Sequence, residues 1–170
     1  MKKLALIGLA TVFVFAACGT GAKKDGPKDM DKAAHAVEGM RRIRVMEDSL
    51  FNAGTGFDPR GAQALVDVYL AFAKAHPLDT ITPEYLMRAA GVKRSLKDPN
   101  GSIALYDRLI RDYGNYRKIP DAYYLKAFVI DNDLGRKGEA KRAYEEVIDR
   151  YPEHPFAADA QRMIDYLGLS

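Results

Sequence analysis

Several residue types are scarce in this 170-residue chain, and each scarcity excludes a class of protein. The single cysteine excludes an intramolecular disulfide framework, and only three histidines argue against a multi-histidine metal site. An excess of one sign of charge is also nearly absent. Lys2 and Lys3 lie in a segment that we expect to be removed, and without them 24 basic side chains face 23 acidic ones, a net charge of +1. So small a charge attracts phosphate backbones weakly, and we expect no nucleic-acid partner.

Long hydrophobic runs are missing as well. The hydrophobic run near the start, residues 4–17, has 14 residues without a charge, whereas a membrane-spanning helix needs about 20. A short basic start followed by such a run is typical of a secretory signal peptide. The composition of the whole chain, 48% hydrophobic and 29% charged, indicates a folded domain rather than a disordered chain.

The hydrophobic run ends in Phe15-Ala16-Ala17-Cys18-Gly19. Small residues just before a cysteine resemble the processing site of bacterial lipoproteins, although Phe15 stands where leucine is usual. The resemblance implies a signal peptide over 1–17 and a lipid-modified Cys18 as the first mature residue. Gly19, in place of an acidic residue, implies the outer membrane, with the protein facing the periplasm. The alternative is a secreted protein with a free thiol.

Residues 18–32 contain glycines, a proline and mixed charges without apolar periodicity, which predicts a flexible tether. From residue 33 onward, apolar side chains recur at three- and four-residue steps. We expect a capping helix within 33–59 and a repeat domain over 60–170. No strand pattern is present, so the chain is predicted to be all-α with seven helices. The last six are expected to begin near residues 59, 82, 99, 120, 138 and 155.

The second half of the chain repeats itself. An offset of 38 residues places 96–113 on 134–151 without a gap, so that Tyr106 meets Tyr144. A helix-pair unit with a period of about 34 to 40 residues is typical of a helical solenoid. The same offset places Tyr85 on Tyr123 and Ala89 on Ala127, and an offset of 37 places Tyr69 on Tyr106 and Phe72 on Leu109.

One unit carries a family resemblance. Ala140, Tyr144, Val147 and Pro152, which follow Leu134-Gly135, resemble the second helix of a tetratricopeptide repeat (TPR). The stretch 151–160 is similar to the longer-looped repeats of bacterial envelope lipoproteins. The resemblance covers about residues 60–168 and is strongest in the last unit. It implies a right-handed solenoid of helical hairpins, a fold that serves many different binding tasks.

In proteins that resemble this one, the first helix of each pair lines a groove for a peptide or a partner helix. Most side chains at the corresponding positions here are apolar or small, which predicts an apolar or helical ligand held by packing. The alternative is that several of these side chains belong to the core. The predicted groove residues are Glu84, Met87, Gly91, Arg94, Ala122, Leu125, Val129 and Asn132.

No cluster of residues predicts catalysis. His76 aligns with Tyr113 and Tyr151 in the repeat, which predicts a packed residue at a helix end. None of the four serines lies in a nucleophile motif, and no histidine or cysteine pair has metal-ligand spacing. We therefore expect no enzymatic activity, no cofactor and no metal.

A basic cluster, Arg41, Arg42 and Arg44, leaves two readings open. It could contact an anionic surface, or it could form an ion-paired outer face with Glu38, Glu47 and Asp48, which lie within helical reach. The second reading is the more favoured of the two.

These observations predict a lipid-anchored, non-enzymatic interaction module of the cell envelope, in which a TPR-like scaffold binds a protein or peptide partner. A role in an outer-membrane assembly or secretion complex fits this pattern, with the protein monomeric outside its complex. The alternative is a structural envelope lipoprotein that associates with itself through the helix near 33–53.

Overall fold

The computed structural model describes residues 27–52, 54 and 56–169, and every regular element within them is an α-helix. The predicted signal peptide and Cys18 lie outside the described residues. The fold is therefore all-α, as the sequence predicted. The seven helices are α1 (Pro27–Asn52), α2 (Pro59–Ala75), α3 (Thr82–Ser95), α4 (Pro99–Asp112), α5 (Ile119–Asn132), α6 (Lys137–Arg150) and α7 (Pro155–Leu169).

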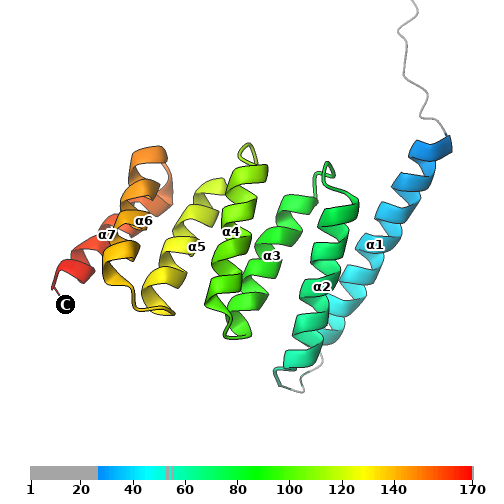
Figure 1. The fold of residues 1–170 in the computed structure, drawn as a ribbon, viewed down its shortest axis with the longest axis horizontal. Helices are drawn as coiled ribbons and strands as arrows, with labels where there is room; N and C mark the ends of the chain where they lie inside the picture. Colours follow the sequence, from blue (N-terminus) through cyan, green and yellow to red (C-terminus); the bar gives the residue numbers. More distant parts are fainter. Residues whose placement is uncertain (1–26, 53, 55, 170) are drawn as a thin grey trace, which may run out of the picture.

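The helices form a single row of antiparallel neighbours in chain order (Figure 1). Each helix packs on the next one, and α5 also contacts α7 across α6. No helix pair can bury its apolar stripe alone, so the stacking of pairs builds one continuous core. The architecture is a TPR-like solenoid of helical hairpins.

Local sequence signals fix where α2 and α4 begin. Asp58 caps α2 by accepting a hydrogen bond from the Arg60 amide at 3.0 Å, and Asp98 caps α4 through the Gly101 amide at 2.8 Å. A proline follows each aspartate at the first helical position, where its missing amide proton costs no hydrogen bond.

The pairs approach closely where small side chains meet. Ser102 and Ala140 occupy the same position in α4 and α6, and both are fully buried. Tyr144 of α6 has no exposed surface either, and its ring packs against that of Tyr124 on α5 with the centroids 5.7 Å apart. These small residues let the helix backbones come together, while the large ring beside them restores close packing.

The repeat spacing differs between the two kinds of helix. From α4 to α6 it is 38 residues, as the sequence alignment predicted, but α3 and α5 both have 14 residues and start 37 apart, at Thr82 and Ile119. The extra residue lies in the loop after α5, because residues 133–136 connect α5 to α6 while only 96–98 connect α3 to α4. The predicted alignment of α3 with α5 at 38 is therefore wrong by one position.

The first helix is longer than expected. α1 begins at Pro27, six residues before the predicted helix start at residue 33. Proline at the first position and acidic side chains at Asp29 and Asp31 favour a helix start, since carboxylates near the N-terminus interact favourably with the positive end of the helix dipole. Among the helices described, none is long and apolar enough to cross a membrane.

Candidate functional site

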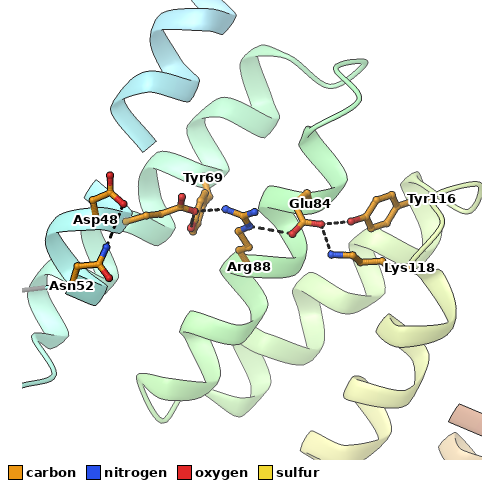
Figure 2. A network of polar contacts seen from close by, with 8 residues as sticks. Asp48, Asn52, Tyr69, Glu84, Arg88, Tyr116 and Lys118 are labelled. Carbon is orange, nitrogen blue, oxygen red and sulfur yellow. Dashed lines mark hydrogen bonds and ion pairs between the residues drawn. The ribbon is translucent and has the colours of Figure 1, made fainter. Parts of the chain in front are cut away.

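A polar network connects α1, α3 and the loop before α5 (Figure 2). Arg88 on α3 contacts Glu47 on α1 at 2.7 Å and Glu84 on its own helix at 3.1 Å. Glu84 also accepts a hydrogen bond from Lys118 at 2.8 Å and another from the Tyr116 hydroxyl. The alternation of two carboxylates with two cations neutralises the charges along this surface.

The electrostatics of the network follow from its geometry. Burial alone raises the pKa of Glu84, but the hydrogen bonds from Lys118, Tyr116 and Arg88 outweigh burial and lower that pKa to about 2. Burial, together with the hydrogen bond to Glu47, raises the pKa of Tyr69 well above its ordinary value. Glu84 is therefore ionised and Tyr69 is neutral at physiological pH.

A second ion pair links consecutive repeats farther along α3. The Arg94 guanidinium contacts Asp133, directly after α5, at 2.5 and 3.3 Å. The same guanidinium lies 4.8 Å from the centroid of the Phe128 ring, in a cation–π arrangement. Arg94 thus connects the two repeats, and its charge has a partner within the chain.

The eight predicted groove residues fall into different environments. On α3, Gly91 is exposed while the other three are half-buried, and on α5 Leu125 is half-buried and Asn132 exposed. Ala122 and Val129 lie in the core at 0% and 1% exposure, so neither can contact a partner. The cause is the one-residue spacing error described above, since one residue turns a helix by about 100°. At the observed offset of 37, the counterparts of Glu84, Met87, Gly91 and Arg94 are Asp121, Tyr124, Phe128 and Asp131.

Most of these corrected positions already have partners within the chain. Tyr124 stacks on Phe156 of α7 with the ring centroids 4.4 Å apart, and Asp131 accepts a hydrogen bond of 3.5 Å from the Tyr144 hydroxyl. Phe128 lies under Arg94. The α5 portion of the predicted groove is therefore largely occupied by the protein itself.

The surface is open around Gly91. A side chain built at Gly91 meets no heavy atom within 4 Å, and a hollow of about 560 Å³ lies beside it. We call this feature the Gly91 hollow. Besides Gly91, its walls include Asp48 and Phe51 of α1, Arg88 and Val92 of α3, and Tyr69 of α2.

Sequence reasoning missed the contribution of α1 to this hollow. Phe51 is 62% exposed and presents a phenyl ring at its edge, and Asp48 has only a 3.5 Å hydrogen bond from Asn52. Phe51 lies next to Leu50 in the last turn of α1, so its only signal was an apolar residue off the buried stripe. Which helix it faces depended on how α1 packs against α3.

Within the part of the chain that the structure describes, no group of three or more histidine, cysteine, aspartate or glutamate side chains is arranged to hold a metal ion. His76 lies at the C-terminal cap of α2 and packs against Phe72, with the ring centroids 4.8 Å apart. His154 is half-buried at 4.0 Å from Asp121. The polar contacts described above thus connect helices, and the Gly91 hollow is an open feature next to the predicted groove residues of α3.

Comparison with known proteins identifies one repeat directly. Residues 121–154, which comprise most of α5, all of α6 and the following turn, match the family model of the tetratricopeptide repeat. No curated protein matches the chain as a whole. The matched repeat and the stacked hairpins indicate a TPR-containing protein, and such repeats are typically non-enzymatic scaffolds for protein–protein interaction.

Proposed function

We propose that this protein is a lipid-anchored interaction module of the bacterial cell envelope, and that it docks a partner protein at the Gly91 hollow. The observation that carries the docking proposal is a glycine in the middle of α3 that the fold itself does not require. A mid-helix glycine costs about 1 kcal/mol relative to alanine. Gly91 is in a helical conformation and has free space around it, so neither backbone strain nor close packing explains its presence.

The shape and chemistry of the hollow favour a large apolar side chain as the anchor of the partner. Phe51 offers an exposed ring, and Val92 and the missing side chain of Gly91 leave a recess beside it. An apolar residue on a helix or extended peptide can enter such a recess, while Arg88 and Asp48 offer polar contacts at its margin. Because Arg88 is already paired with Glu47, packing supplies most of the binding energy.

The anchor rests on the sequence around Cys18, which lies outside the described residues. Two or more acyl chains hold a protein stably on a bilayer, and the lipoprotein pattern at Cys18 provides for such a modification. Gly19 supports the outer membrane, with the module facing the periplasm, and a role in an assembly or secretion complex. The proposal also takes the protein to be non-enzymatic and monomeric outside that complex.

Docking is tested by filling the hollow. A photo-crosslinking amino acid at Ser95, which lines the hollow, is expected to give a discrete crosslinked product in the cells that make the protein. Adding Gly91→Leu should abolish that product. The matched control is Gly138→Leu, because Gly138 on α6 also has no heavy atom within 4 Å of a built side chain and lies far from α3. Equal crosslinking in both variants contradicts docking at this hollow.

The anchor is tested separately. Metabolic labelling with palmitate should mark the wild-type chain, and Cys18→Ser should remove both the label and the sedimentation with membranes. Membrane association that survives Cys18→Ser without label argues against the anchor, and it leaves the docking experiment unaffected.

Self-association is the second candidate function, and the exposed apolar residues of α1 favour it. Val37 and Val45 are 61% and 56% exposed on the outer helix of the row. Light scattering on the purified chain at micromolar concentration decides between the two. A monomer supports partner docking, whereas a stable dimer whose formation Val45→Glu prevents supports self-association.

A further inference from the structure

A second hollow lies between α1 and α2, on a different face of α1 from the Gly91 hollow. Its volume is about 490 Å³, and α2 supplies an apolar floor that includes Val68, Ala71 and Phe72. We call it the α1–α2 groove. Nothing in the proposed function uses it, since the docking surface described above lies against α3.

The floor of this groove is rigid. The Phe72 ring meets Tyr85 edge-on with the centroids 5.0 Å apart and an interplanar angle of 86°, and it also packs against His76. From the other side Gly39 of α1 approaches so closely that an added Cβ would lie 2.9 Å from the ring. Phe72 is held on three sides, so the groove is preformed and a ligand need not order it.

The rim of the groove carries charge of one sign. Four side chains that are cationic or can become so surround the floor, namely Lys32, His35 and Arg42 of α1 and His76 at the end of α2. No carboxylate is among the residues that line it. An apolar floor inside a basic rim is complementary to an acidic, amphipathic ligand.

The basic side chains of the rim are not neutralised by the neighbouring acids. Glu38, which lies one helical turn before Arg42 on α1, forms an ion pair with Arg41 instead, at 2.6 Å. Among the residues that the structure describes, Lys32 and Arg42 form no ion pair within 4.0 Å. The arginine cluster noted in the sequence is thus split, with Arg41 paired and Arg42 turned toward the groove.

We infer that the α1–α2 groove binds an acidic amphipathic segment of a partner protein. The apolar side chains of that segment pack on Val68, Ala71 and Phe72, and its carboxylates pair with Lys32 and Arg42. A protein segment fits better than a lipid surface, because the apolar contact lies recessed between two helices rather than on a projecting edge. This site is independent of the Gly91 hollow, and either can fail without the other.

The test uses two fluorescein-labelled synthetic 14-residue peptides and the full-length chain. One peptide has leucines at helical spacing with glutamates elsewhere, and the other has lysine in place of every glutamate. Fluorescence anisotropy should show saturable binding of the acidic peptide and none of the basic one. Replacing both rim cations, Lys32→Gln with Arg42→Gln, should weaken binding about tenfold or more. The matched control, Arg44→Gln, alters an exposed arginine of α1 outside the groove and should leave binding unchanged.

A second pair of variants tests the floor. Ala71→Phe places a ring in the groove and should block the acidic peptide, whereas Ala104→Phe, at an exposed alanine of α4, should not. Circular dichroism establishes that both variants fold. Equal binding of the two peptides, or unchanged binding in the rim variants, overturns the proposal. The proposal is also overturned if the protein does not bind the acidic peptide but binds vesicles containing phosphatidylglycerol through Lys32 and Arg42, because the groove is then a lipid contact.

Discussion

Glu47 and Arg88 are 41 residues apart in the sequence, yet their side chains meet at 2.7 Å and connect α1 to α3. The same carboxylate accepts a hydrogen bond from the Tyr69 hydroxyl on α2 (Figure 2). One carboxylate therefore joins three consecutive helices at the wall of the Gly91 hollow. This junction positions α1 relative to the repeats behind it.

The junction predicts coupling between Glu47 and Arg88. Glu47→Gln should lower the free energy of unfolding by about 1–3 kcal/mol, because Arg88 and Tyr69 lose a charged acceptor in a half-buried site. Urea unfolding of Glu47→Gln, Arg88→Met and the double variant gives the interaction energy. Additive effects of the two substitutions would show that the contact does not stabilise the fold.

Acid should weaken the fold through Glu84. Its folded-state pKa of about 2 lies below the ordinary value of 4.5, so ionised Glu84 stabilises the folded state above about pH 4.5. That contribution is lost as the pH falls from about 4.5 toward 2. Glu84→Gln should reduce stability at pH 7 and flatten the decline in acid. Urea midpoints measured between pH 2 and pH 7 check this, and parallel curves for the two proteins would contradict it.

Two glycines of the first two repeats should respond to alanine in opposite directions. Gly91→Ala meets no atom within 4 Å and removes a poor helix former, so it should stabilise the protein by about 1 kcal/mol. Gly39→Ala places a methyl group 2.9 Å from the fixed Phe72 ring, and overpacking should cost about 1–3 kcal/mol. Thermal unfolding of the two variants measures both changes in stability. Changes of the same sign would contradict the close approach of α1 to the Phe72 ring.

The buried hydroxyl of Ser102 predicts a stabilising substitution. Its Oγ is enclosed and has no hydrogen-bond partner of good geometry, while alanine, Ala140, occupies the equivalent position in α6. Ser102→Ala should therefore raise the free energy of unfolding by about 1 kcal/mol. A lower melting temperature in this variant would mean that the hydroxyl is bonded in solution.

Backbone strain at Lys97 predicts another gain. Lys97 has a φ of 60° in the loop after α3, and Gly135 has a φ of 64° at the same place in the loop after α5. A left-handed conformation suits glycine better than lysine, so Lys97→Gly should stabilise by about 0.5–1 kcal/mol. Lys97→Ala keeps the strain and serves as the control. Equal unfolding midpoints for the two variants would contradict this account.

Local signals predicted the helices and their order well. Asp58-Pro59 and Asp98-Pro99 mark helix starts that the structure confirms, since caps and prolines act within a few residues. The start of α1 at Pro27 was missed because the residues after it are polar and carry no apolar stripe. Helical propensity without amphipathic periodicity is a weak signal.

The sequence by itself determined an all-α chain of stacked hairpins, because capping and apolar periodicity depend on residues close together in the chain and the repeat spacing can be counted along it. Only the tertiary structure decided which faces remain open. Because the extra residue of the second repeat lies in the loop at 133–136, α5 follows α3 at 37 residues rather than 38, and Ala122 and Val129 lie in the core. The packing of α1 placed Phe51 beside Gly91 and Arg42 beside Phe72. Such contacts join residues distant in the chain, so they depend on helix rotation and separation, which local propensities do not specify.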